Sequence, residues 1–172
     1  MSLTTDEEAL LAAITAAPAD DAPRLVYADW LQERGEETKA EYLRTVVRLM
    51  HPPEDAADVA RVFDLANYLD AAWRQRVGGQ FEVMLEGAAP LMLVAHAIRA
   101  VLNIAQHKAA DMWRAGEPVR LQSTLTREEA EELIGSFGTA QLHKSAGEDP
   151  PLKLTVRPMT EESGATLFAP RN

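Results

Sequence analysis

The chain is 172 residues long, with 47% hydrophobic and 26% charged residues, a composition typical of a globular protein that builds one good core or two small ones. It contains no cysteine, which excludes disulfides, thiolate zinc sites and cysteine nucleophiles. Its formal net charge is −10, and the stretches 1–50, 51–79, 80–145 and 146–172 are each negative, which argues against nucleic-acid binding. No apolar run approaches the roughly eighteen residues of a membrane span, and the N-terminus lacks the basic start of a signal peptide, so we expect a cytoplasmic protein that does not bind membranes.

The first half of the chain carries apolar residues at helical spacing and no strand pattern. Thr5 and Glu8 match a capping box at the start of the first helix, and Pro18 ends that helix. His51-Pro52-Pro53 forces a break after the third helix. We expect four helices, over about residues 5–17, 23–34, 38–50 and from near 54 to the Gly78-Gly79 pair.

Residues 20–35, DDAPRLVYADWLQERG, contain the densest group of chemically versatile side chains in the sequence. Asp20 or Asp21 can cap a helix, Pro23 suits its first turn, and Gly35 follows its last turn. The apolar face of this helix comprises Val26, Tyr27, Trp30 and Leu31.

We interpret this apolar face as a packing surface, because aromatic residues at helical spacing usually belong to a core. Asp29 would then form a local cap or an ion pair with Arg24, Arg34 or a neighbouring helix. The alternative is a ligand-sensing or hydrolytic site, in which Asp29 acts as a base or a ligand-binding acid beside a wall formed by Tyr27 and Trp30.

The hydrophobic period changes at Gln80 from helical spacing to alternation. Thr126 to Glu129 form a second capping box, whose helix we expect to end at Gly138. The expected strands cover residues 81–85, 119–121, 141–144 and 152–157, and the expected helices cover residues 91–102, 105–115 and 126–137. This order, β-α-α-β-α-β with one additional strand, predicts an α+β domain.

Residues 6–50 resemble the repeat-companion domain, a short bacterial module often found beside leucine-rich and similar repeats. The matching core is DDAPRLVYADWLQERG followed by AEYLR. The resemblance implies a helical accessory unit of a bacterial multi-module system, and the family brings no assigned reaction. The motif residues of this helical module are Asp21, Pro23, Arg24, Tyr27, Asp29, Trp30 and Arg34.

Residues 80–145 resemble the C-terminal domain of the bacterial ribosomal stalk protein of the L seven/L twelve type. The ClpS-type adaptor of bacterial proteolysis shares that fold, so the fold alone does not select a role. The segments that correspond to the family's elements are Phe81 to Leu85, Ala97-Ile98-Arg99, His107 to Asp111 and Thr126 to Glu131.

The ribosomal domain recruits translation factors through basic and apolar residues on its first two helices. By position, its basic sites correspond to Leu91, His96, Arg99 and Ala110, and its apolar contacts to Met92 and Ala95. Only Arg99 keeps the positive charge. The resemblance therefore implies a stalk-like fold, with a translation-linked, factor-recruiting role as one alternative.

No group of residues matches a catalytic or metal-binding motif. His51, His96, His107 and His143 are scattered and lack the spacing of a helix-borne zinc site, although His96 and His107 could approach one another between their helices. Ser136 lacks the spacing of a nucleophile elbow. We therefore expect no enzymatic activity, no cofactor and no metal.

The helix over residues 91–102 has more apolar residues than one buried face needs. The core face can be filled by Leu93, Val94, Ala97, Ile98 and Val101. We expect a second, partner-binding surface on the same helix, formed by Leu91, Met92, Ala95, His96 and Arg99. The simpler alternative is a helix that is enclosed on most sides.

These observations predict two modules and an irregular tail. The helical module covers residues 1–76, the stalk-type module covers 80–157, and the tail covers 158–172. The favoured function is that of a non-catalytic adaptor that binds protein partners, with self-association as one option.

Overall fold

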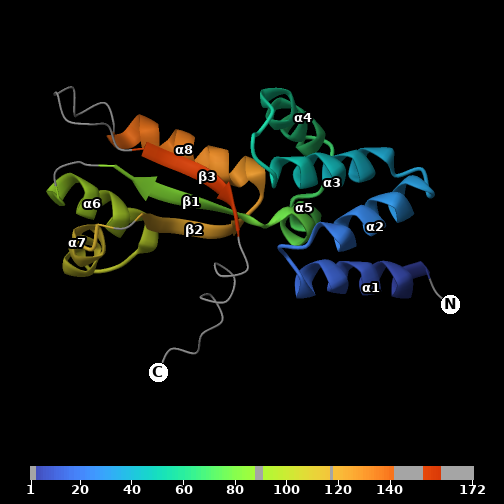
Figure 1. The fold of residues 1–172 in the computed structure, drawn as a ribbon, viewed down its shortest axis with the longest axis horizontal. Coiled ribbons are helices and arrows are strands. Elements are labelled where there is room, and N and C mark those ends of the chain that lie inside the picture. The colour runs from blue at the N-terminus through green and yellow to red at the C-terminus, as the bar shows by residue number, and fades with distance from the viewer. Residues whose placement is uncertain (1–2, 88–90, 117, 142–152, 160–172) are drawn as a thin grey trace. The chain divides into compact units, whose positions relative to one another are not determined.

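Figure 1 shows the fold in a computed structural model, which describes residues 3–87, 91–116, 118–141 and 153–159. These residues form eight helices and a three-stranded antiparallel sheet, which confirms the expected α+β class. The chain divides into two compact units. The first contains the chain up to Phe81, Thr124–Glu128 and the segment from Pro158 onward, and the second contains Glu82–Ser123 and Glu129–Arg157. Residues 124–128, expected in the second module, thus belong to the first unit.

Five helices build most of the first unit. They are α1 (Leu3–Ala16), α2 (Asp21–Gln32), α3 (Glu37–Leu49), α4 (Ala56–Ala66) and α5 (Ala71–Gly78). Helix α3 packs against α2, α4 and α5, and α1 packs against α2 and α5. The side chains that these helices bury are mostly aliphatic and aromatic, and include Ile14, Tyr27, Leu31, Leu43, Val46, Leu49, Val62 and Val77.

Aspartate side chains cap three of these helices. Asp20 accepts a hydrogen bond from the Ala22 amide at 3.0 Å, Asp55 from Ala57 at 2.8 Å, and Asp70 from Trp73 at 2.9 Å. Each bond satisfies one of the amide groups that a helix start leaves without an intrahelical partner. The expected choice between Asp20 and Asp21 is therefore resolved in favour of Asp20.

Two sequence-based helix boundaries in this unit are wrong. Helix α1 already begins at Leu3, so Thr5 lies inside the helix instead of capping it. The expected fourth helix is two helices, because α4 ends at Ala66 and Asp70 caps a new helix. Between them, the amides of Tyr68 and Leu69 bond to carbonyls three residues back, which tightens the chain into a turn.

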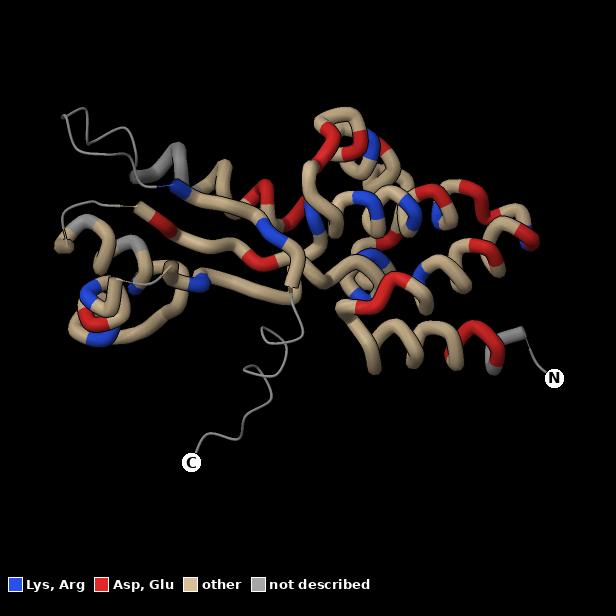
Figure 2. The backbone as a smooth tube through the Cα atoms, viewed as in Figure 1, with Lys and Arg blue, Asp and Glu red and all other residues tan. Residues whose placement is uncertain are grey.

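The segment Thr124–Glu128 is held in the first unit by buried polar contacts. Glu128 accepts hydrogen bonds from the Tyr42 hydroxyl at 3.1 and 3.2 Å and pairs with Arg74 at 2.7 Å. Arg127 pairs with Glu54 at 2.9 Å. Figure 2 shows further acidic and basic residues along the helices of this unit. Some of them form ion pairs near the surface: Arg44–Asp29, Arg48–Asp58, Arg61–Glu41 and Arg76–Glu8.

The second unit contains most of the sheet and of three helices. The strands are β1 (Phe81–Glu86), β2 (Val119–Leu125) and β3 (Lys153–Pro158), and the helices are α6 (Leu91–Leu102), α7 (Gln106–Arg114) and α8 (Arg127–Gln141). Strand β1 is central, between β2 and β3, and α6 packs against α7. Val83 and Leu85 are fully buried on the same face of β1, because alternate strand residues share a face.

A buried carboxylate links all three strands. Glu82 on β1 is 1% exposed and pairs with Arg120 on β2 and with Arg157 on β3, both at 2.8 Å. Two guanidinium groups thus offset the cost of burying one carboxylate.

The end of α8 differs from the sequence-based expectation. The helix continues through Gly138 to Gln141, so Gly138 does not end it and Gln141 is helical instead of extended. Residues 142–144 of the expected strand and residues 160–172 of the expected tail lie outside the described residues. Strand β2 extends four residues beyond the expected 119–121 segment, and Met159 is buried.

Candidate functional site

Helix α2 places Tyr27 in the core of the first unit. The side chain is fully buried, its hydroxyl donates to Glu7 Oε1 at 2.7 Å, and the hydroxyl accepts from the Trp73 indole at 3.2 Å. Burial raises the pKa of Tyr27, so the phenol stays protonated at neutral pH. Tyr27 is therefore a hydrogen-bonded packing residue.

Asp29 lies outside that core, and the Trp30 ring lies at its edge, 5.8 Å from the Tyr27 ring between centroids. Asp29 is exposed and pairs with Arg44 of α3 at 2.6 Å, which identifies the neighbouring helix as its partner among the three expected. Trp30 is half-buried, and the Arg34 guanidinium lies over its ring at 3.6 Å from the centroid. Tyr27 is thus enclosed, whereas Asp29 is exposed and paired with Arg44.

The other motif residues of α2 have structural contacts. Asp21 lies 2.6 Å from His51 Nε2, and Pro23 occupies the first turn of the helix as expected. Val26, expected on the buried face, is 55% exposed. That expectation was wrong, because the buried stripe of α2 runs through Arg24, Tyr27, Ala28 and Leu31 and leaves Val26 on the solvent side.

Arg24 is the fully buried cation of α2. Its Nε donates to the Val77 carbonyl at 2.9 Å and its Nη1 donates to the Asp20 carbonyl at 3.1 Å. Burial lowers the pKa of Arg24 to about 10, and the carboxylates of Asp21 and Asp20 act in the opposite direction. The guanidinium therefore remains charged at neutral pH although it is removed from water.

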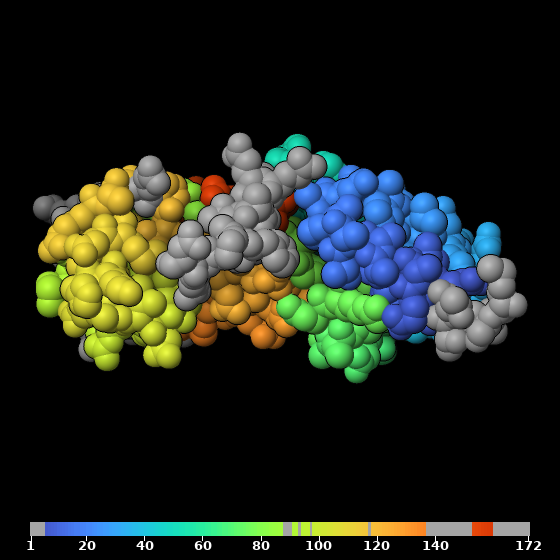
Figure 3. Space-filling view, turned by 90° about the horizontal axis from the view of Figure 1, so that it is seen from below, coloured from blue at the N-terminus to red at the C-terminus, as the bar shows by residue number. Residues whose placement is uncertain are grey.

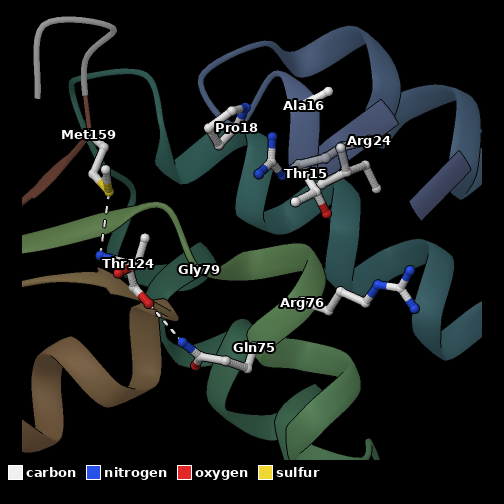
Figure 4. Close-up of a pocket in the computed structure, with 10 residues that line it drawn as sticks. Thr15, Ala16, Pro18, Arg24, Gln75, Arg76, Gly79, Thr124 and Met159 are labelled. Carbon is white, nitrogen blue, oxygen red and sulfur yellow. Dashed lines mark hydrogen bonds between the residues drawn. The ribbon is translucent and has the colours of Figure 1, made fainter. Parts of the chain in front are cut away.

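Arg24 also lines a pocket of about 460 Å³ in the first unit (Figure 4). The end of α1 contributes Ile14, Thr15 and Ala16, followed by Pro18. The remaining wall consists of Gln75, Arg76, Gly79, Thr124 and Met159.

Two hydrogen bonds fix the wall of the pocket opposite α1. Gln75 Nε2 donates to the Thr124 carbonyl at 2.7 Å, and the Thr124 amide donates to the Met159 sulfur at 3.4 Å. A Cβ at Gly79 would lie 2.8 Å from the Gln75 carbonyl oxygen and 3.1 Å from that of Thr124, so the close approach requires glycine. Sequence reasoning missed this pocket because five separate segments form it.

Helix α6 separates the expected partner-binding residues into two groups. Met92 is 69% exposed, and His96 and Arg99 are exposed at the i+4 and i+7 positions on the same face. Leu91 is half-buried. Ala95 is fully buried beside Val94 and Ile98, so its expected place on the partner-binding surface was wrong.

The described parts of the chain were searched for clusters of metal-ligating side chains and for membrane-spanning helices. Within them, no group of three His, Asp or Glu side chains could hold a metal ion, and His96 and His107 are both exposed. None of the helices in these ranges has the length and apolar character needed to cross a bilayer.

Comparison of the sequence and structure with family models, curated proteins and solved structures finds no match.

Proposed function

We propose that the chain is a non-catalytic adaptor that binds a protein partner through the exposed face of α6. The observation that carries this proposal is Met92, a large apolar side chain that is 69% exposed beside exposed His96 and Arg99. An exposed methionine can make adaptable apolar contacts with a partner, and the charge of Arg99 can orient that partner on the helix face. Figure 3 shows part of the surface of α6 and α7 in lime and yellow.

The charge of the α6–α7 pair indicates the chemistry of the partner. Residues 91–116 contain three Arg or Lys and one Asp, a formal charge of +2, whereas the whole chain carries −10. On α7, Met112 is 38% exposed and adds a second apolar contact. A partner segment with apolar anchors and acidic flanks would complement this surface, and the charge difference would orient its approach.

The wider assignments rest on sequence resemblance and element order. The order β1-α6-α7-β2-α8-β3 supports a stalk-type or ClpS-like fold for the second unit, and the capped α2 supports a repeat-companion-like module in the first. A cytoplasmic adaptor of a bacterial multi-module system is consistent with both. The alternative centred on Asp29, Tyr27 and Trp30 has less support, because Tyr27 is enclosed and Asp29 is paired with Arg44.

Affinity capture from the native cell extract tests the adaptor proposal. The parent chain is compared with a Met92→Glu/Arg99→Glu double variant, which places two acids on the α6 face. Val26→Glu is the matched control, because Val26 is also an exposed apolar helix residue but lies on α2.

We expect the parent and Val26→Glu to retain the same partner and the double variant to lose it while keeping the parent's circular dichroism spectrum. Equal capture by all three chains, or a specific partner with none of them, would refute the proposed role of α6.

A further inference from the structure

The pocket in the first unit combines an apolar wall with a single buried cation. Ile14, Ala16, Pro18 and Met159 supply apolar surface, and Arg24 supplies the charge. Its volume of about 460 Å³ falls within the range of roughly 300–1,000 Å³ that is typical of small-molecule sites. Size and composition are therefore suitable for a small organic ligand.

The hydrogen bonds of Arg24 leave donors available. A guanidinium carries five N–H groups, and the two bonds to the Val77 and Asp20 carbonyls use one on Nε and one on Nη1. Among the described residues, no carboxylate lies within 4.0 Å of this guanidinium: the Asp20 carboxylate caps α2, and Asp21 pairs with His51. Nη2 therefore has no acceptor within the described part of the chain.

A buried cation that is bonded only to carbonyl oxygens is electrostatically incomplete. Removing a charge from water is costly unless an opposite charge or a full set of hydrogen bonds replaces the water. In Figure 4 the Arg24 guanidinium lies beside Pro18, whereas the Arg76 side chain extends away from it. Arg76 pairs with Glu8 at 2.8 Å, so Arg24 is the lining cation that lacks a carboxylate.

We propose that this pocket binds a small organic monocarboxylate, with its carboxylate on the Arg24 guanidinium and its aliphatic or aromatic body against Ile14, Ala16, Pro18 and Met159. A planar guanidinium matches a carboxylate in a bidentate geometry, and one available cation suits one negative charge. The apolar wall favours an extended hydrocarbon body over a compact phosphate ion. This site is separate from the α6 face and does not depend on the adaptor proposal.

The test is a titration of the full chain with octanoate, followed by the amide NMR signals of Gly79 and Thr124, which line the pocket. Octylamine has the same body with the opposite charge, octanol has a neutral head, and acetate and inorganic phosphate have no apolar body. We expect saturable shifts with octanoate, weaker shifts with octanol and acetate, and none with octylamine or phosphate.

Three variants locate the binding. Arg24→Met removes the charge and should weaken octanoate binding about 10- to 100-fold, the range typical of a charged hydrogen-bonded contact. Arg76→Met removes the other lining arginine and should leave the affinity within about twofold. Ala16→Trp leaves Arg24 in place and should fill the pocket, because Ala16 lines it from the exposed end of α1.

Loss of octanoate binding in Ala16→Trp supports the pocket even if Arg24→Met fails to fold. Binding that is equal for octanoate and octylamine would overturn the role of Arg24. Phosphate binding stronger than octanoate binding, or unchanged octanoate binding in Ala16→Trp, would overturn the proposed ligand class or its location.

Discussion

Substitution of Tyr42 by phenylalanine removes a hydroxyl that joins two distant parts of the first unit. The fully buried hydroxyl donates to the Glu128 carboxylate at 3.1 and 3.2 Å. A hydrogen bond to a charged group contributes about 1.5–3 kcal/mol, and these lengths place the expected loss near the lower end, about 1.5–2 kcal/mol. For a chain of this size, the corresponding fall in Tm is about 3–8 °C.

The measurement is urea unfolding of Tyr42→Phe in a Trp113→Phe background, so that the remaining fluorophores, Trp30 and Trp73, report on the first unit. Tyr68→Phe is the matched control, because Tyr68 is 82% exposed and its hydroxyl is solvated in both states. The control should change the free energy of unfolding by less than about 0.5 kcal/mol.

A double-mutant cycle with Glu128→Gln identifies the partner of the lost hydroxyl. Groups in direct contact show coupling of about 0.5–3 kcal/mol, whereas separated groups are additive. If Tyr42→Phe costs no more than Tyr68→Phe, or if its effect is additive with that of Glu128→Gln, the placement of Thr124–Glu128 in the first unit is refuted.

Three further perturbations test other parts of the structure. Glu82→Gln removes the charge that joins two arginines across the sheet and should lower the free energy of unfolding by about 2 kcal/mol. This loss is smaller than for a fully enclosed ion pair, because both arginines are partly exposed. An unchanged free energy of unfolding in chemical denaturation would contradict the buried bridge. Gly79→Ala should lower the free energy of unfolding by about 1–3 kcal/mol, because its Cβ would lie 2.8 Å from a carbonyl oxygen. Gly135→Ala has open space in the middle of α8 and should raise the free energy of unfolding by about 0.5–1 kcal/mol. Thermal melts that reverse this order would show that the chain path at Gly79 is different. The guanidinium of Arg48 lowers the pKa of Asp58, so the ion pair stabilises the fold above the unfolded-state pKa of this carboxyl, and the contribution is lost as the pH falls through the lower folded-state pKa. Asp58→Asn should remove at most about 1 kcal/mol at pH 7 and less at acidic pH, and an equal loss at both would exclude an ionic cause.

Local signals in the sequence predicted most of the helices. Helix α6 covers residues Leu91–Leu102 as expected, and α2 and α3 begin and end within about two residues of the expected positions. Apolar spacing, aspartate caps and helix-ending glycines all act over a few residues, so one sequence contains them. The break before α5 carried such a signal too, in Asp70 ahead of Ala71, but the continued apolar spacing from Val59 to Trp73 concealed it.

Long-range contacts were not predictable in the same way. The assignment of Thr124–Glu128 to the first unit depends on Tyr42 and Arg74, which lie more than fifty residues earlier in the chain. The Ala95 error has a related cause: helical spacing gives the direction of a side chain, but the extent of the buried face depends on the neighbouring elements. A small residue such as alanine fits either environment, so its type gives no further information.

Arg24 shows that part of the pocket was nevertheless encoded locally. The buried residues of α2 are Arg24, Tyr27, Ala28 and Leu31, which follow the i, i+3, i+4, i+7 pattern of one helix face. A charged residue at the first position of an otherwise apolar stripe must be paired, hydrogen-bonded or available to a ligand. The carbonyls of Val77 and Asp20 provide only part of that compensation, and the cavity beside the guanidinium is where an anion would complete it.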